Sequence, residues 1–448
     1  MTRAAARPAG PVTAAAPRAA LRLLAGVSPD PAAHPLSLAE HHRVHGPRPR
    51  CSARSAGPDT LTPDGLIAAA RACGLRGRGG GRYPLAAKLA AVAGRRGRPL
   101  VVLNGAEGEP ASRKDAALLG RSPHLALGGA ALAAEAVGGS EVVVWLVREP
   151  GAPIRQVRDA VAERAAAGTE PVTFRVECGP PRYVSGNTSS VVNHLSGGPA
   201  LPRFGTHAAV HGVHGRPTLV SNTETLAHLA LLARRGVRWY RSVGDPDEPG
   251  TMLVTLAGAV RHQVVAEVPT GTPIGAVVAA AAPLGMPQAV LVGGYGGGWL
   301  PWPDAAAVPL TTAALRRAGG SIGAGLVAVL PVERCGLAET AHLAGWLAGE
   351  TAGQCGPCVH GLPALAGTLR ALAAGGAGAE AVGRLHRWAG MVTRRGLCGH
   401  PDGVAFLVRS ALGVFGREIT AHGHGWCSAV DRRPLLPTPR HCDPRELR

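Results

Sequence analysis

The chain has 448 residues, of which 46% are hydrophobic and 3% aromatic, with 63 glycines and 39 prolines. It is long enough for roughly two to four domains with cores of their own. The sequence contains no apolar run of about eighteen residues, so it predicts no transmembrane segment. The formal net charge of +18 suits acidic partners. However, the arginines are spread along the chain without an aromatic-interleaved basic patch, so we expect no nucleic-acid binding. The first residues lack the apolar segment of a secretory signal, which favours a cytoplasmic protein.

The nine cysteines do not indicate a disulfide framework in a cytoplasmic protein. Six of them are expected to have no chemical role, three because they lie among apolar residues and three because they lie in polar, proline-bearing stretches. The first three are Cys73, Cys178 and Cys335, and the second three are Cys51, Cys427 and Cys442.

The first part of the chain changes character near residue 59. Residues 1–58 have weak periodicity and many Pro, Arg and His residues, so we expect a mostly disordered basic extension with one short helix near residues 36–45. From Thr62-Pro63, a helix-start signal, to residue 245, helices alternate with strands as in a layered α/β domain. The helices are expected at 66–73, 85–93, 123–137 and 154–167, and the strands at 99–103, 141–147 and 172–176.

The pattern changes again after residue 245. Short β-branched runs between Gly/Pro turns predict a compact β-rich module over residues 246–325. Its strands are expected at 253–256, 264–268 and 289–292, and its single helix at 274–282. Residues 326–418 have helical spacing and predict a small helical bundle, and residues 419–448 are expected to form a tail. The bundle helices are expected at 338–348, 362–372, 379–392 and 404–415.

A glycine-rich loop, residues 74–82, lies between the first two expected helices of the α/β domain. Its open backbone N–H groups precede a helix N-terminus and suit a phosphate, with Arg76 and Arg78 as charged donors. It is not the dinucleotide-binding fingerprint, because a helix precedes it and Arg82 stands where the last glycine would be. A flexible arginine–glycine linker explains the same residues, and the loop alone does not decide between the two.

Three further cysteines have the spacing of metal ligands. Cys355 and Cys358 lie in Gly353-Gln354-Cys355-Gly356-Pro357-Cys358, and Cys398 lies in Gly396-Leu397-Cys398-Gly399. A closed zinc or 4Fe-4S site has four ligands. Three thiolates can hold a 3Fe-4S cluster, or a 4Fe-4S cluster whose fourth iron takes another ligand, for which His360 and His400 are candidates. A zinc site with one histidine and complete loss of the cluster remain alternatives.

The loop and the cysteines belong to an ordered series of motifs. The others are Tyr83, Pro84 and Lys88 after the loop, then residues 104–115, 183–186 and 216–225. In this order, from about residue 36 to 415, the chain resembles the NADH-binding, 51 kDa-type subunit of respiratory NADH:quinone oxidoreductase. It equally resembles the related diaphorase subunits of NAD-linked hydrogenases and formate dehydrogenases.

The resemblance implies an α/β multidomain fold and a cofactor set. The parts would be an α/β FMN-binding domain over residues 59–245, a β-grasp-like (SLBB-type) module, and a C-terminal helical iron–sulfur bundle. Glu109 matches a catalytic position beside the nicotinamide nucleotide, and the cysteines match the second to fourth cluster ligands. The protein would position FMN, which itself accepts the hydride. The residues implied to hold FMN are Arg76, Gly77, Arg78, Gly79, Gly80, Lys88, Asn104, Glu107, Tyr183, Gly186, Val220, Ser221, Asn222 and Thr225.

Five positions depart from the family's pattern. Ala106 stands where the family has an acid that bonds the flavin, and Arg82 replaces a glycine that keeps the nucleotide channel open. Asn187 and Thr188 replace two carboxylates that would hold NADH. Each lost contact costs about 1–3 kcal/mol, so these changes bear on NAD(H) binding more than on FMN binding. Ala352 stands where the family has its first cluster cysteine.

The function implied is electron transfer by an oxidoreductase. NADH or a substitute donor would reduce FMN, and single electrons would pass to a 4Fe-4S cluster, or to a 3Fe-4S cluster given Ala352. The departures favour a paralogue that serves a ferredoxin-like protein, a membrane reductase or another quinone-linked partner, and that is peripheral to the membrane through that partner. Two alternatives stay open. One is a reductase running in the opposite direction, from reduced ferredoxin to the flavin, and the other is a non-catalytic binding subunit that keeps the fold.

Overall fold

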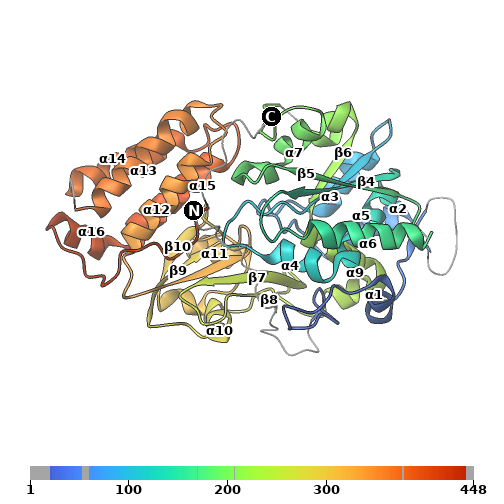
Figure 1. The fold of residues 1–448 in the computed structure, drawn as a ribbon, viewed down its shortest axis with the longest axis horizontal. Helices are drawn as coiled ribbons and strands as arrows, with labels where there is room; N and C mark the ends of the chain where they lie inside the picture. Colours follow the sequence, from blue (N-terminus) through green and yellow to red (C-terminus); the bar gives the residue numbers. More distant parts are fainter. Residues whose placement is uncertain (1–20, 53–59, 169, 206, 376–377, 440–448) are drawn as a thin grey trace.

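The computed structural model describes residues 21–52, 60–168, 170–205, 207–375 and 378–439. It has three parts, seen in Figure 1: a parallel sheet flanked by helices, a mixed sheet, and a group of C-terminal helices. The expected α/β multidomain fold class is therefore confirmed. Within the described residues, no helix has both the length and the apolar character needed to cross a bilayer.

The first sheet has four parallel strands in the order β5-β4-β3-β6. They are β3 (Leu100–Asn104), β4 (Glu141–Val147), β5 (Thr173–Gly179) and β6 (Thr218–Asn222). β3 and β4 are runs of Val and Leu that are buried on both faces, as in sheets covered on both sides. The chain moves from β3 to β4 and β5 on one side and returns to β6 on the other. The strand order therefore reverses at β3, and such a switch point leaves a crevice at the carboxyl ends of the strands.

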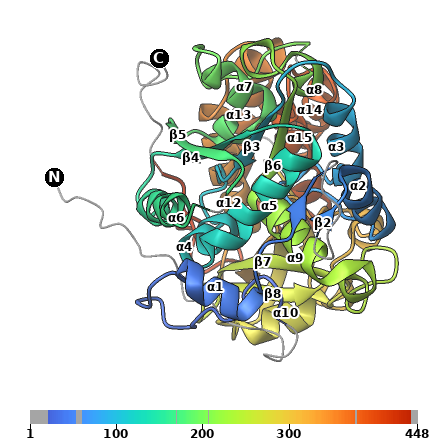
Figure 2. The same cartoon turned by 90° about the vertical axis from the view of Figure 1, so that its right-hand side faces the viewer.

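Helices cover this sheet. α5 (Pro123–Ala136) is buried along nearly its whole length and packs against α9 (Thr223–Tyr240), as Figure 2 shows. The two backbones approach so closely that a Cβ at Gly129 would lie 1.8 Å from the carbonyl oxygen of Leu226. The sequence does not predict α9. The other helices here are α2 (Pro63–Ala72), α3 (Leu85–Ala93), α4 (Lys114–Arg121), α6 (Ile154–Ala166), α7 (Thr188–Leu195) and α8 (Ala208–His211).

Residues 21–52 are packed onto the rest of the molecule. The fully buried carboxylate of Glu267 accepts the backbone N–H groups of Arg22, Leu23 and Leu24 at 2.9–3.0 Å. The expectation of a mostly disordered extension does not hold for these residues, because their partner is more than two hundred positions away and no local pattern reveals it. Residues 1–20 and 53–58 lie outside the described residues.

The expected short helix in this segment is α1 (Leu38–His45). It begins with a capping box, in which the Ser37 and Glu40 side chains each bond the other's backbone N–H. A two-residue parallel pair, β1 (Arg50–Cys51) with β2 (Thr60–Leu61), follows it.

The second sheet is mixed, with the order β10-β9-β11-β7-β8. β11 pairs in parallel with β7 and antiparallel with β9, so the middle strand comes from residues beyond 325, where the sequence predicts a domain boundary. A short apolar run next to a helix is not distinguished from helix by its periodicity. The strands are β7 (Thr251–Gly258), β8 (Val264–Pro269), β9 (Pro287–Val292), β10 (Gly298–Pro301) and β11 (Leu326–Pro331), with helices α10 (Ile274–Ala280) and α11 (Thr312–Arg317).

The C-terminal helices share a core with the mixed sheet, to which Leu291 and Trp299 contribute. The segment after the last helix packs there too, because Glu339 accepts the backbone N–H groups of Leu435 and Leu436 at 2.8 and 2.9 Å. The expected tail is therefore ordered up to residue 439. The helices are α12 (Gly336–Gly349), α13 (Leu362–Ala373), α14 (Gly378–Val392), α15 (His400–Val414) and α16 (Gly416–Gly423), of which the first four are predicted from the sequence.

Candidate functional site

The switch point of the parallel sheet opens into two adjoining cavities. Asn104 at the end of β3 lies in register with Asn222 at the end of β6. A cavity of about 150 Å³ lies beside them, and a larger one of about 560 Å³ shares part of its lining. The residues predicted to hold FMN that line these cavities are Gly77, Gly79, Gly80, Lys88, Asn104, Glu107, Tyr183, Gly186, Val220, Ser221, Asn222 and Thr225.

The glycine-rich loop forms a tight turn at the smaller cavity. The N–H of Gly77 donates to the carbonyl of Tyr83 at 2.9 Å, and Gly80 has a φ of +100°, which favours glycine. A Cβ at Gly79 would lie 3.1 Å from the Cβ of Asn222, so the loop approaches the end of β6 closely because it lacks side chains. This cradle of backbone is compatible with the phosphate of FMN.

Neither Arg76 nor Arg78 is among the described residues that line the two cavities. Arg76 is exposed. Arg78 is buried, with its guanidinium 3.9 Å from the Glu224 carboxylate and 3.1 Å from the carbonyl oxygen of Thr251. Its backbone N–H donates to the Thr225 hydroxyl at 2.8 Å. Arg78 therefore anchors the loop to α9 and β7, and a flavin contact stays a prediction for both arginines.

Positive charge at the smaller cavity comes from Lys88 and from the start of α9. The Lys88 ammonium donates to the carbonyl of Val220 at 3.1 Å, and its burial lowers the pKa. α9 begins beside Asn222, whose side-chain oxygen accepts the N–H of Glu224 at 3.0 Å. An ammonium and a helix N-terminus at a glycine loop are the elements of a phosphate site.

A network of buried charges forms one wall of the larger cavity. Asn222 donates to the Asp115 carboxylate at 2.5 Å, and the Lys114 ammonium lies 2.9 Å from Asp115 and 3.2 Å from Glu224. Burial alone would raise the pKa of Glu224, but the Lys114 ammonium lowers that pKa to about 2. Burial raises the pKa of Asp115, and the same ammonium opposes the rise. The amide of Asn222 is therefore fixed by a charged partner.

Glu107, predicted to face the flavin, directs both carboxylate oxygens to the start of α4. One accepts from the Ser112 hydroxyl at 2.5 Å and from the N–H of Asp115 at 3.2 Å. The other accepts the N–H of Ala116 at 3.0 Å. Glu107 thus stabilises a helix N-terminus while also lining the larger cavity.

Glu109 is a buried carboxyl group on the wall of the larger cavity. It accepts from the Tyr183 hydroxyl at 3.1 Å and from the backbone N–H of Tyr295 at 2.8 Å. Burial raises its pKa to about 7, although both hydrogen bonds oppose the rise. Gly294 makes this packing possible, since a Cβ there would lie 2.4 Å from the carboxylate. A carboxyl group with such a pKa can take up or release a proton near neutral pH.

Arg82, which stands where the family has a glycine, forms an ion pair with a residue of the mixed-sheet part. Its guanidinium pairs with Glu248 and donates to the Thr312 hydroxyl at 3.2 Å. Its backbone has a φ of +49°, a region that glycine enters more easily. Arg82 also lines the smaller cavity.

Three of the other departures place neutral side chains in the cavity lining. Ala106 and Asn187 line the larger cavity, and Thr188 lines the smaller one. Asn187 uses its side-chain oxygen to cap α7, accepting the N–H of Ser189 at 2.9 Å. The positions where the family would place carboxylates therefore offer a methyl group, an amide and a hydroxyl.

The three motif cysteines lie near one another, and one of them, Cys398, lines the larger cavity. Cys355 and Cys358 lie between α12 and α13, and Cys398 immediately precedes α15. Burial, together with the charges of Cys355 and Cys398, raises the pKa of the Cys358 thiol to about 11. Cys398 lines the larger cavity, as do Glu109 and Gly80. Three thiols from two segments suit a cluster held at three of its corners.

The two histidines considered for the fourth position differ. His360 is exposed, whereas His400 is buried with its ring centroid 5.0 Å from that of Tyr183. The His400 Nε2 lies 2.8 Å from the carbonyl oxygen of Leu347, and its Nδ1 has no hydrogen-bond partner among the described residues. Ala352 brings only a methyl group to the loop.

Several site residues are not apparent from the sequence. Tyr295 holds Glu109 through its backbone, and no side-chain signal marks such a role. Lys114 belongs to a recognised motif, but only the fold brings its charge to Glu224. Cys335 and Cys427, expected to have no role, lie close to each other and to His422.

Comparisons with known proteins give matches along most of the chain. Residues 70–231 match the Nuo51 FMN-binding domain, and residues 338–422 match the NADH-ubiquinone oxidoreductase-F iron-sulfur binding region. The chain is 29% identical over 376 residues to an F-type subunit of the NADH-quinone oxidoreductase of Rhizobium meliloti, covering 81% of this chain and 89% of that protein. It is 28% identical over 375 residues to the F-type subunit of the NADH-quinone oxidoreductase of Streptomyces coelicolor, covering 81% and 84%.

A solved structure is also similar. It is that of an NAD+-reducing NiFe hydrogenase in the H2-reduced state, with a TM-score of 0.76 and 33% sequence identity. The similarity covers 80% of this chain, which spans 63% of the hydrogenase chain.

Proposed function

We propose that this chain, which belongs to the family of Nuo51 and related F-type subunits, transfers electrons from a two-electron donor through FMN to an iron–sulfur cluster. The premise is that it has both an FMN-binding and an iron–sulfur binding region. In this proposal the donor is NADH or a substitute. The acceptor beyond the cluster is a ferredoxin-like protein or a quinone-linked partner.

One observation carries the proposal. The larger cavity is lined both by Gly80 and Asn104 of the expected flavin site and by Cys398 of the expected cluster site. Glu109 lines the same cavity. A donor, a flavin and a cluster could therefore meet around one cavity, which is the arrangement that stepwise electron transfer needs.

FMN, when bound, accepts a hydride and releases its electrons singly. The chain's own residues would bind and orient it. Lys88 and the N–H groups of the glycine loop would hold the phosphate, since both lie at the smaller cavity. Asn104 donates to the carbonyl of Gly186 at 2.8 Å, and this bond, like that of Asn222 to Asp115, keeps an amide fixed at the strand ends. Fixed amides cost little reorganisation when they orient a bound ring.

Glu109 would bind and release a proton close to the donor. With a pKa of about 7, its carboxyl group is protonated in a large fraction of molecules near neutral pH. Tyr183 and the N–H of Tyr295 orient the two oxygens.

The neutral side chains of Asn187 and Thr188 in the cavity lining bear on the binding of the donor. A ribose hydroxyl that loses a hydrogen-bond acceptor loses about 1–3 kcal/mol of binding, or roughly a factor of 10 to 100 for each contact. We therefore propose weak NADH binding, or a donor that does not need those carboxylates.

The cluster in this proposal is held by Cys355, Cys358 and Cys398. It would be a 3Fe-4S cluster, or a 4Fe-4S cluster with a ligand other than cysteine at its fourth iron. The partner that receives the electrons would carry an iron–sulfur centre or belong to a membrane reductase, and the chain would be peripheral to the membrane through it.

The test is the cofactor content and reduction of the purified chain. After anaerobic reconstitution with iron, sulfide and FMN, we expect bound flavin and at least about three irons per chain. Stopped-flow absorbance would then compare bleaching of the flavin by NADH and by reduced ferredoxin. Bleaching by NADH supports the proposed direction, and bleaching by ferredoxin alone supports the reverse one. If no flavin binds, or if neither donor bleaches the bound flavin, the result would support the alternative of a non-catalytic binding subunit.

A further inference from the structure

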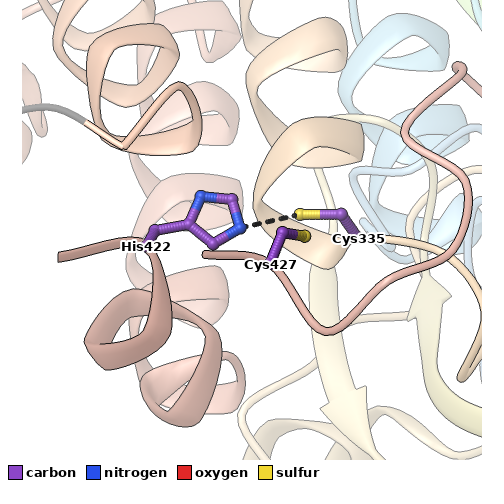
Figure 3. A group of neighbouring side chains, drawn as sticks. All are labelled: Cys335, His422 and Cys427. Atoms are coloured by element: carbon purple, nitrogen blue, oxygen red, sulfur yellow. Dashed lines mark hydrogen bonds between the residues drawn. The ribbon is translucent and has the colours of Figure 1, made fainter. Parts of the chain in front are cut away.

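A second group of metal-ligand side chains lies apart from the three motif cysteines. One ligand atom each from Cys335, His422 and Cys427 lies within 4.8 Å of the other two. Figure 3 shows the three side chains gathered at one point. Cys335 precedes α12, His422 lies in the last turn of α16, and Cys427 follows that helix. We propose that Cys335, His422 and Cys427 bind a Zn²⁺ ion.

The distances are those of ligands around a single ion. Zinc binds cysteine sulfur at about 2.3 Å and histidine nitrogen at about 2.0–2.1 Å in a tetrahedron, so a sulfur and a nitrogen ligand are separated by about 3.5 Å. The Sγ of Cys335 and the Nε2 of His422 lie 3.5 Å apart. A cluster would spread its ligands over several irons and hold them further apart.

The surroundings suit a structural ion. Cys335 is 2% exposed and His422 is 1% exposed. The N–H of Ala338, in the first turn of α12, donates to the Cys335 sulfur at 3.3 Å. Two sulfurs and an imidazole form a soft ligand set that prefers zinc to magnesium or calcium.

Glu418 lies nearest to the fourth position. Its Oε2 is 3.4 Å from the Cys335 sulfur and also accepts the N–H of Leu337 at 3.2 Å. It is not one of the three residues whose ligand atoms are mutually within 4.8 Å. The protein therefore supplies three ligands directly, and the fourth position is left for water or for this carboxylate after a small rotation.

The site would fasten the C-terminal helices. Cys335 and His422 are 87 positions apart, and the intervening segment contains Cys355, Cys358 and Cys398. The match to the iron–sulfur binding region, residues 338–422, includes neither Cys335 nor Cys427. The ion would hold the start of α12 against the end of α16, and this role does not depend on the flavin or on electron transfer.

The test measures zinc and iron separately in the full chain. Protein expressed with added ZnCl2 and purified under reducing conditions without chelator would be analysed by mass spectrometry for both metals. We expect about one zinc per chain, falling below about a tenth in Cys335→Ser and in Cys427→Ser. Cys73→Ser is the matched control, because Cys73 is an equally buried thiol outside the group, and it should keep its zinc. Cys355→Ser should lose iron and keep zinc, so failure of the electron-transfer proposal and failure of this one are distinguishable.

A second measurement applies if Cys335→Ser does not fold. Co²⁺ added to the zinc-free native chain should give a thiolate charge-transfer band that is missing in Cys427→Ser, whose position is only partly buried. Less than about a tenth of a zinc in the native chain, zinc retained by both serine variants, or no cobalt band would overturn the proposal. A Cys335–Cys427 disulfide found by mass spectrometry under the same reducing conditions would also overturn it.

Discussion

The carboxylate of Glu109 accepts a hydrogen bond from the hydroxyl of Tyr183 at 3.1 Å, which joins two separate motifs of the parallel-sheet part. The other carboxylate oxygen accepts from the backbone of Tyr295 in the mixed-sheet part. One buried acid thus connects three segments that surround the larger cavity, and its protonation is coupled to how well they are held together.

Glu109→Gln should remove a pH dependence of stability. The pKa of Glu109 is raised in the folded protein from its ordinary 4.5 to about 7. Its stabilising contribution is therefore present below pH 4.5 and is lost as the pH rises through about 7. Between these limits the free energy of unfolding of the native protein should fall by on the order of 3 kcal/mol more than that of the variant. Urea unfolding from pH 4.5 to 8.5 measures the difference, and parallel curves would contradict it.

Ala352→Cys should restore a fourth cluster ligand. Three thiols already converge, and a fourth thiolate in the loop would let a cubane be held by cysteines alone. We expect higher iron occupancy, or conversion of a three-iron to a four-iron cluster, after anaerobic reconstitution. EPR and iron analysis follow the change, with Ala352→Ser as the matched control. An unchanged cluster type and stability would count against cysteine ligation at position 352.

Lys88→Gln should weaken FMN binding more than riboflavin binding. A charge-assisted hydrogen bond to a phosphate is worth about 1.5–3 kcal/mol, which corresponds to roughly 10- to 100-fold in affinity. Fluorescence titration with both flavins measures the ratio. Arg71→Gln, which removes an exposed charge at the end of α2, should change neither affinity. Equal losses for FMN and riboflavin would mean that Lys88 does not contact the phosphate.

Two neighbouring glycines in α5 should respond in opposite directions. At Gly129 a Cβ would lie 1.8 Å from the carbonyl oxygen of Leu226, so Gly129→Ala must separate α5 from α9 and should destabilise the fold by about 3 kcal/mol or more. At Gly128 the nearest atoms are 3.7 Å away, and Gly128→Ala should stabilise by up to about 1 kcal/mol through helix propensity. Thermal unfolding of the pair compares them directly, and similar midpoints would contradict the close approach of the two helices.

The sequence predicts those parts of the structure in which local pattern and fold agree. β4 is an uninterrupted apolar run and α12–α15 have clear helical spacing, and all five are confirmed. By contrast, α9 begins inside a binding motif and contains Gly236 at a φ of +77°. β11 is a short apolar run beside a helix, and its place in the middle of a sheet depends on pairing with distant strands.

The candidate site also contains residues that the sequence predicts and contacts that it does not. The motif residues around Asn104 and Asn222 could be named from the sequence, because each motif is a local string. The ion pair of Arg78 with Glu224 and the hydrogen bond from the N–H of Leu23 to Glu267 join residues far apart in the chain, and no local pattern contains both partners. The grouping of Cys335 with Cys427 was missed for that reason as well.

The position of β11 has a consequence for how the molecule unfolds. Leu326 and Leu330 of this strand lie in the same core as Leu343 of α12 and Leu407 of α15. Among the described residues, the C-terminal helices thus share one apolar interior with the sheet on which they lie. Heat or denaturant should open sheet and helices in a single cooperative transition, so a cluster would be released only when half of the molecule loses its order.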